Sequence, residues 1–479
     1  MDSSFRQLRV GLAGLGLETY WPQFEKLEER LRGYLDVVRE RVEGNDRRIV
    51  IDLGLIDSPP KAIKAGHLCR LEDIDILLVY ITTYALSSTI LPVIQRAKVP
   101  VVLLNLQPEA AIDYALFNQM TSRTAMTGEW LAYCSSCPVP EIANVLRRLD
   151  IPFQQVTGVL QDDPACWDDL EGWLTAAEVA KTLSHSRMGL MGHYYSGMLD
   201  LATDLTQVSG RFGTHVEMVE VDQLSGLRRE VTKPQTAAKV EEFHSFFAVD
   251  EECSLEELER AATTAVALDR MVANNALDML AYYYMGSGVA ENENTMSSII
   301  LGTSMLTGGG VPVAGEYEVK NVLAMKIMDE LGAGGSFTEY YAMDFNEDLV
   351  LMGHDGPGHP RIAQNKIRVR PLRVYHGKVG HGLSVEMAVK YGPVTLLSVV
   401  EDKEKGFSLL VAEGESVAGP ILEIGNTNSR YRFSLGARGF VEAWSARGPA
   451  HHCAIGVGRW GDRLRKIATL MNLGFHQVC

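Results

Sequence analysis

Two hydrophobic periodicities alternate along the first 180 residues, and this alternation constrains the fold more than any other feature. Segments of helical pattern, such as residues 21–42, separate short apolar runs of strand length at residues 9–15, 48–53, 76–81 and 99–104. This order is typical of a parallel sheet covered by helices. Ligands bind beyond the carboxyl ends of the strands in such sheets, so we expect binding loops at residues 16–23, 80–88 and 105–108.

The pattern changes twice further along the chain. A second strand and helix alternation follows residues 162–173, with helices expected over residues 255–285. From about residue 308 glycine becomes dense, and from residue 366 apolar and polar residues alternate with period two, which indicates antiparallel strands. We therefore predict an α/β protein with three domains. Two doubly wound, Rossmann-like domains (1–180 and 181–310) precede an antiparallel, β-barrel-like domain (311–479).

The charge and the cysteines exclude several classes of protein. The chain has 45 Lys plus Arg against 61 Asp plus Glu, a net charge of −16, and no basic block. Such a chain repels phosphate backbones and anionic lipid, so we expect no nucleic-acid partner and no membrane association. The seven cysteines are few and odd in number, which indicates reduced thiols and a cytoplasmic location.

Side chains able to bind metals gather in three glycine-rich segments. Glu316 lies in the first (311–321), Glu339 and His354 lie in the second (334–360), and the pair His451 and His452 lies in the third (448–456). Taken singly, a glutamate is usually solvated surface and a loop histidine is usually exposed. Adjacent strand residues point to opposite faces, so we expect at most one of the two histidines to face a site.

Together these groups would form a mixed oxygen and nitrogen site, which suits Mn²⁺, Co²⁺ or Mg²⁺ better than a thiolate zinc centre does. Spacing alone leaves open whether they converge.

Four segments resemble motifs of the L-arabinose isomerases, in the same order. A-G-E-Y-E-V-K (314–320) is similar to the family's A-G-E-x-D-x-K, with Glu318 in place of the usual Asp. F-T-E-Y-Y (337–341) resembles F-M-E-D-Y, and N-E-D-L-V-L-M-G-H (346–354) resembles N-D-L-V-L-G-A-H. The segment E-A-W (442–444), followed by A-H-H (450–452), matches the family's C-terminal motif. The chain is thus identified as a divergent member of the L-arabinose and L-fucose isomerase-like family.

The resemblance implies both a metal site and a reaction. Glu316, Glu339, His354 and His452 would bind a divalent metal, with Mn²⁺ expected and Co²⁺ or Mg²⁺ also fitting, and the two glutamates would act as acid and base. The reaction would interconvert an aldose and a ketose through an enediol. A metal polarises the sugar carbonyl while a carboxylate accepts the C2 proton and returns it to C1. Which glutamate takes that proton is open. Relatives form trimers or hexamers with pockets shared between subunits, so we expect a homotrimer or homohexamer.

The expected sugar contacts match the family less well. Tyr20 is retained in the first binding loop, and Tyr84 occupies the position of an aromatic sugar contact, although a buried strand-end tyrosine would look the same. Met126 stands where the family has a polar histidine, and Met198 is the nearest candidate for an apolar contact. His451 completes the expected set. These departures leave the identity of the small-molecule sugar open.

Two other functions use similar features. A non-catalytic sugar-binding protein could have the same tandem α/β domains, and a sugar epimerase or dehydratase could use the same metal site. The pair Cys134 and Cys137 lacks a second C-x-x-C for structural zinc, and a redox role needs a low-pKa thiol. The glycine run at residues 11–16 does not meet G-x-G-x-x-G, so we expect no nicotinamide cofactor.

Overall fold

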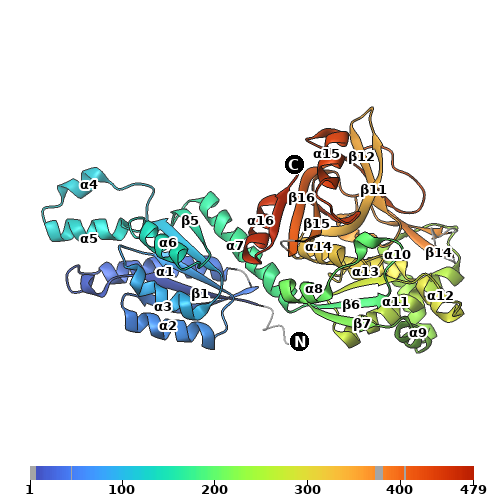
Figure 1. The fold of residues 1–479 in the computed structure, drawn as a ribbon, viewed down its shortest axis with the longest axis horizontal. Coiled ribbons are helices and arrows are strands. Elements are labelled where there is room, and N and C mark those ends of the chain that lie inside the picture. The colour runs from blue at the N-terminus through green and yellow to red at the C-terminus, as the bar shows by residue number, and fades with distance from the viewer. Residues whose placement is uncertain (1–6, 45, 373–380, 404–405) are drawn as a thin grey trace. The chain divides into compact units, whose positions relative to one another are not determined.

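The computed structural model describes residues 7–44, 46–372, 381–403 and 406–479 (Figure 1). Internal contacts divide the chain into two units, Met1–Lys181 and Thr182–Cys479. Among the described residues, no helix combines the length and the apolar character that crossing a bilayer requires.

The first unit is built on a five-stranded parallel sheet of order β2-β1-β3-β4-β5. This is the flavodoxin-like order of doubly wound sheets. Its strands are β1 (Leu8–Leu15), β2 (Arg48–Ile56), β3 (Ile76–Ile81), β4 (Val101–Gln107) and β5 (Phe153–Val159). All six residues of the central strand β3 are apolar and buried, as expected for a parallel strand covered on both faces.

Helices pack on opposite faces of this sheet. Side chains of α2 (Pro59–Leu71), α3 (Ser87–Ala97) and α6 (Val139–Arg148) share a core with Ala13 and Leu15 of β1. On the other face, a Cβ at Gly14 would lie 2.5 Å from the side chain of Leu35 in α1 (Leu27–Glu43). The remaining helices are α4 (Tyr114–Gln119), α5 (Arg123–Tyr133) and α7 (Pro164–Ser184). Alternate residues of β1 therefore pack against the helices on the two faces of the sheet.

The helix expected from residue 21 begins later, at Leu27. Lys26 has a φ of 63°, in the left-handed region, and such a residue interrupts a right-handed helix. Residues 18–20 instead form the short 3-10 helix η2 (Glu18–Tyr20).

The second unit begins with a four-stranded parallel sheet of order β10-β9-β6-β7. Its strands are β6 (Arg187–Gly192), β7 (His215–Val219), β9 (Met279–Tyr283) and β10 (Val313–Ala314). Its helices are η3 (Leu199–Leu201), α8 (Leu205–Phe212), α9 (Val221–Arg229), α10 (Lys233–Phe246), α11 (Leu255–Asn275), α12 (Ala290–Met296) and α13 (Ile300–Gly308). The expectation of helix throughout residues 255–285 is wrong at its end. Ala276 has a left-handed φ of 49° that ends α11, and the apolar run that follows forms the buried strand β9.

A seven-stranded sheet follows, of order β15-β18-β11-β12-β17-β16-β19. Its strands are β11 (Gly334–Asp344), β12 (Leu349–His354), β15 (Gly392–Asp402), β16 (Gly406–Val417), β17 (Thr427–Phe433), β18 (His452–Val457) and β19 (Gly474–Gln477). All neighbours pair antiparallel except β19, which is parallel to β16. Strand β15 also pairs with β16, so each of the six strands β15, β18, β11, β12, β17 and β16 has two neighbours in a continuous series.

Smaller elements surround this sheet. A three-stranded sheet joins β8 (Ala248–Val249), β13 (Arg368–Leu372) and β14 (Gly382–Glu386). The helices of this part are η4 (Pro360–Ile362), α14 (Val319–Glu330), α15 (Gly436–Ser445) and α16 (Gly461–Leu470). Every residue of α14 from Val319 to Met328 is buried, and the helix contacts β9, β11, β15 and β18. It therefore lies in the core between the parallel and the antiparallel sheets of this unit.

The mixed α/β class is confirmed, with parallel sheets first and a large antiparallel sheet towards the C-terminus. The barrel-like closure of that sheet and the domain boundary at residue 310 stay predictions.

Candidate metal and proton-transfer site

Strand register brings two of the predicted ligands together, and a third lies at the end of the neighbouring strand. Glu339 on β11 lies directly opposite His452, the first residue of β18. On its other side Glu339 pairs with Gly353, the neighbour of His354 at the end of β12. Directly opposite residues of an antiparallel pair project to the same face. The register therefore places Glu339 and His452 on one face, and the donor atoms of His354, at the end of β12, lie within 4.8 Å of theirs.

Glu316 reaches the same place from a strained turn. It follows the short strand β10, and both Glu316 and Tyr317 have left-handed φ angles, of 56° and 62°. Such angles are unfavourable for side chains with a Cβ, and they concentrate where function demands a particular geometry. The turn also lies at the carboxyl end of a parallel strand, where ligands of open α/β sheets bind.

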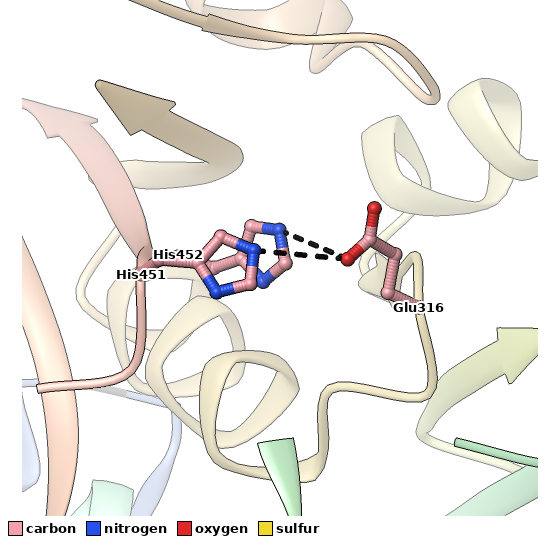
Figure 2. A group of neighbouring side chains, drawn as sticks. All are labelled: Glu316, His451 and His452. Atoms are coloured by element: carbon pink, nitrogen blue, oxygen red, sulfur yellow. Dashed lines mark ion pairs between the residues drawn. The ribbon is translucent and has the colours of Figure 1, made fainter. Parts of the chain in front are cut away.

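The Glu316 carboxylate lies against three imidazoles. Its Oε2 is 3.5 Å from His452 Nε2 and 3.8 Å from His451 Nε2, and both rings point toward it (Figure 2). Its Oε1 is 3.8 Å from His354 Nε2. Glu316, His451 and His452 form one group whose donor atoms all lie within 4.8 Å of one another, and Glu339, His354 and His452 form another. The two groups share His452.

The expectation that only one histidine of the pair would face a site assumed that both lie within a strand. However, β18 begins at His452, and His451 precedes it. Their ring centroids are 3.8 Å apart, and His451 Nε2 is 3.9 Å from Glu339 Oε2. Both rings therefore lie in the cluster.

His452 is held in a form that suits metal binding. The side chain is buried, and its ring lies 4.4 Å from that of Phe337. Burial, followed by repulsion from His451, lowers the pKa of His452 well below its usual value, so the ring is neutral. Among the described residues, neither ring nitrogen has a hydrogen-bond partner. A buried imidazole with unused nitrogens, beside two carboxylates, fits a bound divalent cation.

The pKa of Glu339 suits a group that transfers protons. Burial raises its pKa to about 7, with His451 opposing and Glu316 adding to the shift. A carboxyl group that titrates near neutral pH can both accept and return a proton.

Glu318 was noted from the sequence only as a replacement for Asp, but its position is specific. It is fully buried, and its Oε2 lies 3.6 Å from His452 Nδ1, while its Oε1 lies 3.8 Å from Lys320 Nζ. Burial raises its pKa to about 7, and Lys320 opposes that shift. Metal-binding histidines usually have a carboxylate or carbonyl behind the ring, and Glu318 occupies this place behind His452.

Asp200 was missed by sequence reasoning. Its carboxylate accepts hydrogen bonds from the backbone N and from Nδ1 of His451, although the two residues are 251 positions apart. Burial raises the pKa of Asp200, but these hydrogen bonds outweigh burial, and the net pKa lies below its usual value. The segment shows no motif that could have indicated this contact.

The remaining sugar-contact predictions are distributed over both units. Met198 lies directly before η3 in the second unit, whereas Tyr20, Tyr84 and Met126 belong to the first unit. Tyr20 ends η2, Tyr84 follows β3, and Met126 lies in α5. Burial raises the pKa of Tyr20, and Cys134, Tyr84 and Cys137 add to the shift, so these four side chains are neighbours. The sugar contacts stay predictions.

The chain matches a known family over most of its antiparallel part. Residues 334–474 match the L-arabinose isomerase C-terminal domain, and this span contains Glu339, His354 and His452. Sulfoquinovose isomerase of Alkalicoccus urumqiensis is 22% identical over 334 residues, which cover 69% of this chain and 73% of that protein. Through this domain the chain is similar to the L-arabinose isomerases, and both comparisons support a divergent member of an L-arabinose isomerase-like family. This isomerase acts on sugars and interconverts aldoses and ketoses.

Two solved structures are similar to the chain, with low TM-scores. The match to the S. aureus MnaA–UDP co-structure covers 64% of this chain and 78% of the chain in that structure, with a TM-score of 0.18 and 11% identity. UDP-N-acetylglucosamine 2-epimerase from Rickettsia bellii covers the same shares, with a TM-score of 0.17 and 10% identity. Scores this low do not indicate a shared fold.

Proposed function

We propose that the isomerase is metal-dependent and works through an enediol, with Glu316, Glu339, His354 and His452 as the ligands of one divalent ion. The buried His452, whose ring nitrogens have no hydrogen-bond partner among the described residues, carries this proposal. The bound ion would polarise the sugar carbonyl, and Mn²⁺ is the ion that we expect. The oxygen and nitrogen donors also suit Co²⁺ and Mg²⁺.

The two glutamates divide the proton transfers. One carboxylate takes the proton from C2 of the open-chain aldose and returns it to C1, and the other moves a proton between O1 and O2. The raised pKa of Glu339 favours a group that gains and loses a proton within one turnover. The side chains of Glu316 and Glu339 are 18% and 30% exposed, and this partial burial limits the competition of bulk water for these protons.

Metal titration tests this function. Protein stripped of divalent ions is titrated with Mn²⁺, Co²⁺ or Mg²⁺ while ketose formation is followed for pentoses, hexoses and 6-deoxyhexoses. Sulfoquinovose joins the panel because a relative is a sulfoquinovose isomerase. We expect turnover that depends on the metal and is lost in Glu316→Gln and Glu339→Gln. Full metal affinity and turnover in both variants would show that the assignment is wrong.

The same assay separates the alternatives. Tight sugar binding without turnover would indicate a binding protein. In D₂O, NMR of the product shows label at C1 after isomerisation and at C2 alone after C2 epimerisation. We expect label at C1.

We also propose a cytoplasmic homotrimer or homohexamer of three-domain subunits, in which the first unit of a neighbour supplies Tyr20, Tyr84 and Met126 to the sugar. Met198 and His451 would contact the sugar from the metal-binding subunit. All seven cysteines are free thiols, which supports a reducing compartment. Native mass spectrometry measures the subunit number, and a monomer with full activity would contradict a shared pocket.

A further inference from the structure

The tautomer of His451 is set by Asp200. Asp200 Oδ2 accepts from the His451 backbone N at 3.0 Å and lies 2.6 Å from Nδ1 of the same residue. The pKa of Asp200 lies below its usual value, and an ionised carboxylate has no proton to donate, so it accepts from Nδ1 and the ring proton of neutral His451 is on Nδ1. Nε2 is then an acceptor with an unshared electron pair.

Asp200 is itself fixed from the core. The buried Lys320 donates through Nζ to the carbonyl oxygens of Asp200 (2.7 Å), Leu201 (3.2 Å) and Ala202 (3.3 Å). Lys320 lies in the first turn of α14, which is buried along most of its length. Helix α14 therefore holds the backbone of η3 and, through it, the Asp200 carboxylate.

The Nε2 atom of the His451 ring lies near the carboxylates of Glu316 and Glu339. His451 Nε2 lies 3.8 Å from Glu316 Oε2 and 3.9 Å from Glu339 Oε2. The ring is also packed against that of His452 at 3.8 Å between centroids. About a third of the His451 side chain is exposed, at 36%, so a sugar can reach it.

We propose that Asp200 is a positioning residue of the isomerase. It holds the orientation and tautomer of His451, so that Nε2 accepts a hydrogen bond from a hydroxyl of the sugar bound between the two glutamates. This inference rests on the proposed function, since it assigns a role within the same site. Among the described residues Asp200 makes no hydrogen bond or ion pair with the four proposed metal ligands, and its charge acts on His452 only as a minor cause of that residue's pKa shift, so we expect its main effect to pass through His451.

A double-mutant cycle tests this dependence. Asp200→Ala, His451→Ala and the double variant are compared with the wild type in kcat and KM, in Mn²⁺ affinity and in urea unfolding. We expect Asp200→Ala to lower kcat/KM about 10- to 100-fold, the range typical for loss of an orienting partner. In the His451→Ala background the same change should cost less than about two-fold, because its target is gone. Mn²⁺ affinity should change little.

Two further variants distinguish a loss of positioning from a general loss of folding. Asp200→Asn keeps an acceptor oxygen without the charge, so its kcat/KM should lie between those of the wild type and Asp200→Ala. Asp204→Asn is the matched control, because Asp204 lies four residues away and only caps α8, through Thr206 N and Gln207 N. It should retain wild-type kinetics.

The outcomes separate this inference from the proposed function. If the wild type turns over sugars but the two losses in kcat/KM are additive, the positioning role is wrong and the function stands. If the wild type turns over no sugar of the panel, the cycle is run on Mn²⁺-dependent binding of an open-chain alditol. Coupling there supports the positioning role although the function has failed, and additive losses or no alditol binding overturn it. Loss of Mn²⁺ affinity in Asp200→Ala equal to the loss in kcat/KM would also overturn it.

Discussion

Glu339 and His452 are direct cross-strand partners on β11 and β18, so the carboxylate with a pKa near 7 and the neutral buried imidazole share one face of the antiparallel sheet. Each residue belongs to a regular strand, and neither depends on a loop for its position. Sites built on strands hold their geometry more precisely than sites on loops do. Four predictions follow from this arrangement and its surroundings.

Glu339→Gln should lower kcat by about 10²- to 10⁴-fold, the usual loss on removing a general acid or base. The amide has nearly the same size, so unfolding by urea should change little. The exposed Glu415 on β16 provides the control, since Glu415→Gln should leave kcat as it is. Steady-state kinetics at saturating Mn²⁺ measures both, and similar kcat values for the two variants would contradict the assignment.

Glu318→Gln should weaken Mn²⁺ binding about 10- to 100-fold, as expected for the carboxylate behind a metal-binding histidine. The change removes the negative charge 3.6 Å from His452 Nδ1. Glu330→Gln is matched to it, because Glu330 belongs to α14 and pairs with Lys326 at 3.0 Å. Isothermal titration with Mn²⁺ should show a loss only for Glu318→Gln, and an equal loss in both would point to a general effect on α14.

His359 should contribute a loss of stability below pH 6.5, opposite in sign to the contributions of Glu318 and Glu339, whose raised pKa values favour the folded state as pH falls. Burial, with a smaller contribution from Arg361, lowers the pKa of this histidine to about 4. Between pH 6.5 and 4 this residue binds a proton in the unfolded chain but not in the folded chain, so its contribution to the free energy of unfolding falls as pH falls through this window. The full effect is about 3 kcal/mol, from 1.36 kcal/mol per pKa unit.

Urea unfolding at pH 7 and at pH 4.5 measures this contribution, because His359→Gln should be more stable at pH 4.5 relative to pH 7 than the wild type is. A variant with the pH dependence of the wild type would show that other groups are responsible.

Phe337→Ala should destabilise the second unit by about 3–5 kcal/mol, the range for removing a large buried aromatic side chain. Phe337 is buried, with its ring 4.3 Å from that of His354 and 4.4 Å from that of His452, so Mn²⁺ affinity should fall as well. Phe345 is 62% exposed, and Phe345→Ala should change the free energy of unfolding by no more than about 0.5 kcal/mol. Thermal unfolding with and without Mn²⁺ compares the two, and equal losses would contradict the packing argument.

Local patterns predicted the elements well where periodicity is strong. The apolar run at residues 76–81 is β3, with the bounds expected. Errors arose where a single residue in a left-handed conformation interrupts the pattern, as at Lys26 and Ala276. Hydrophobic periodicity carries no information about such backbone angles, so element ends were less well predicted than element types.

For the site as well, local motifs indicated some residues, whereas contacts between distant segments could not be predicted. Glu316, Glu339, His354 and His452 stand in motifs, and the structure brings them together. Glu318 also stands in the first motif, but its contact with His452, like that of Asp200 with His451, joins residues far apart in the chain. Local spacing in the sequence does not predict the register between β11 and β18. It also does not predict that Asp200 of η3 contacts His451.

The burial of α14 restricts how relatives of this chain can differ in length. The helix is the main connection between Glu316 and Glu339, and its residues from Val319 to Met328 contact core on every side. An inserted or deleted residue there would rotate the helix by about 100° and turn apolar side chains out of their packing. We therefore expect length variation among relatives to lie outside this segment and the spacing between the two glutamates to stay constant.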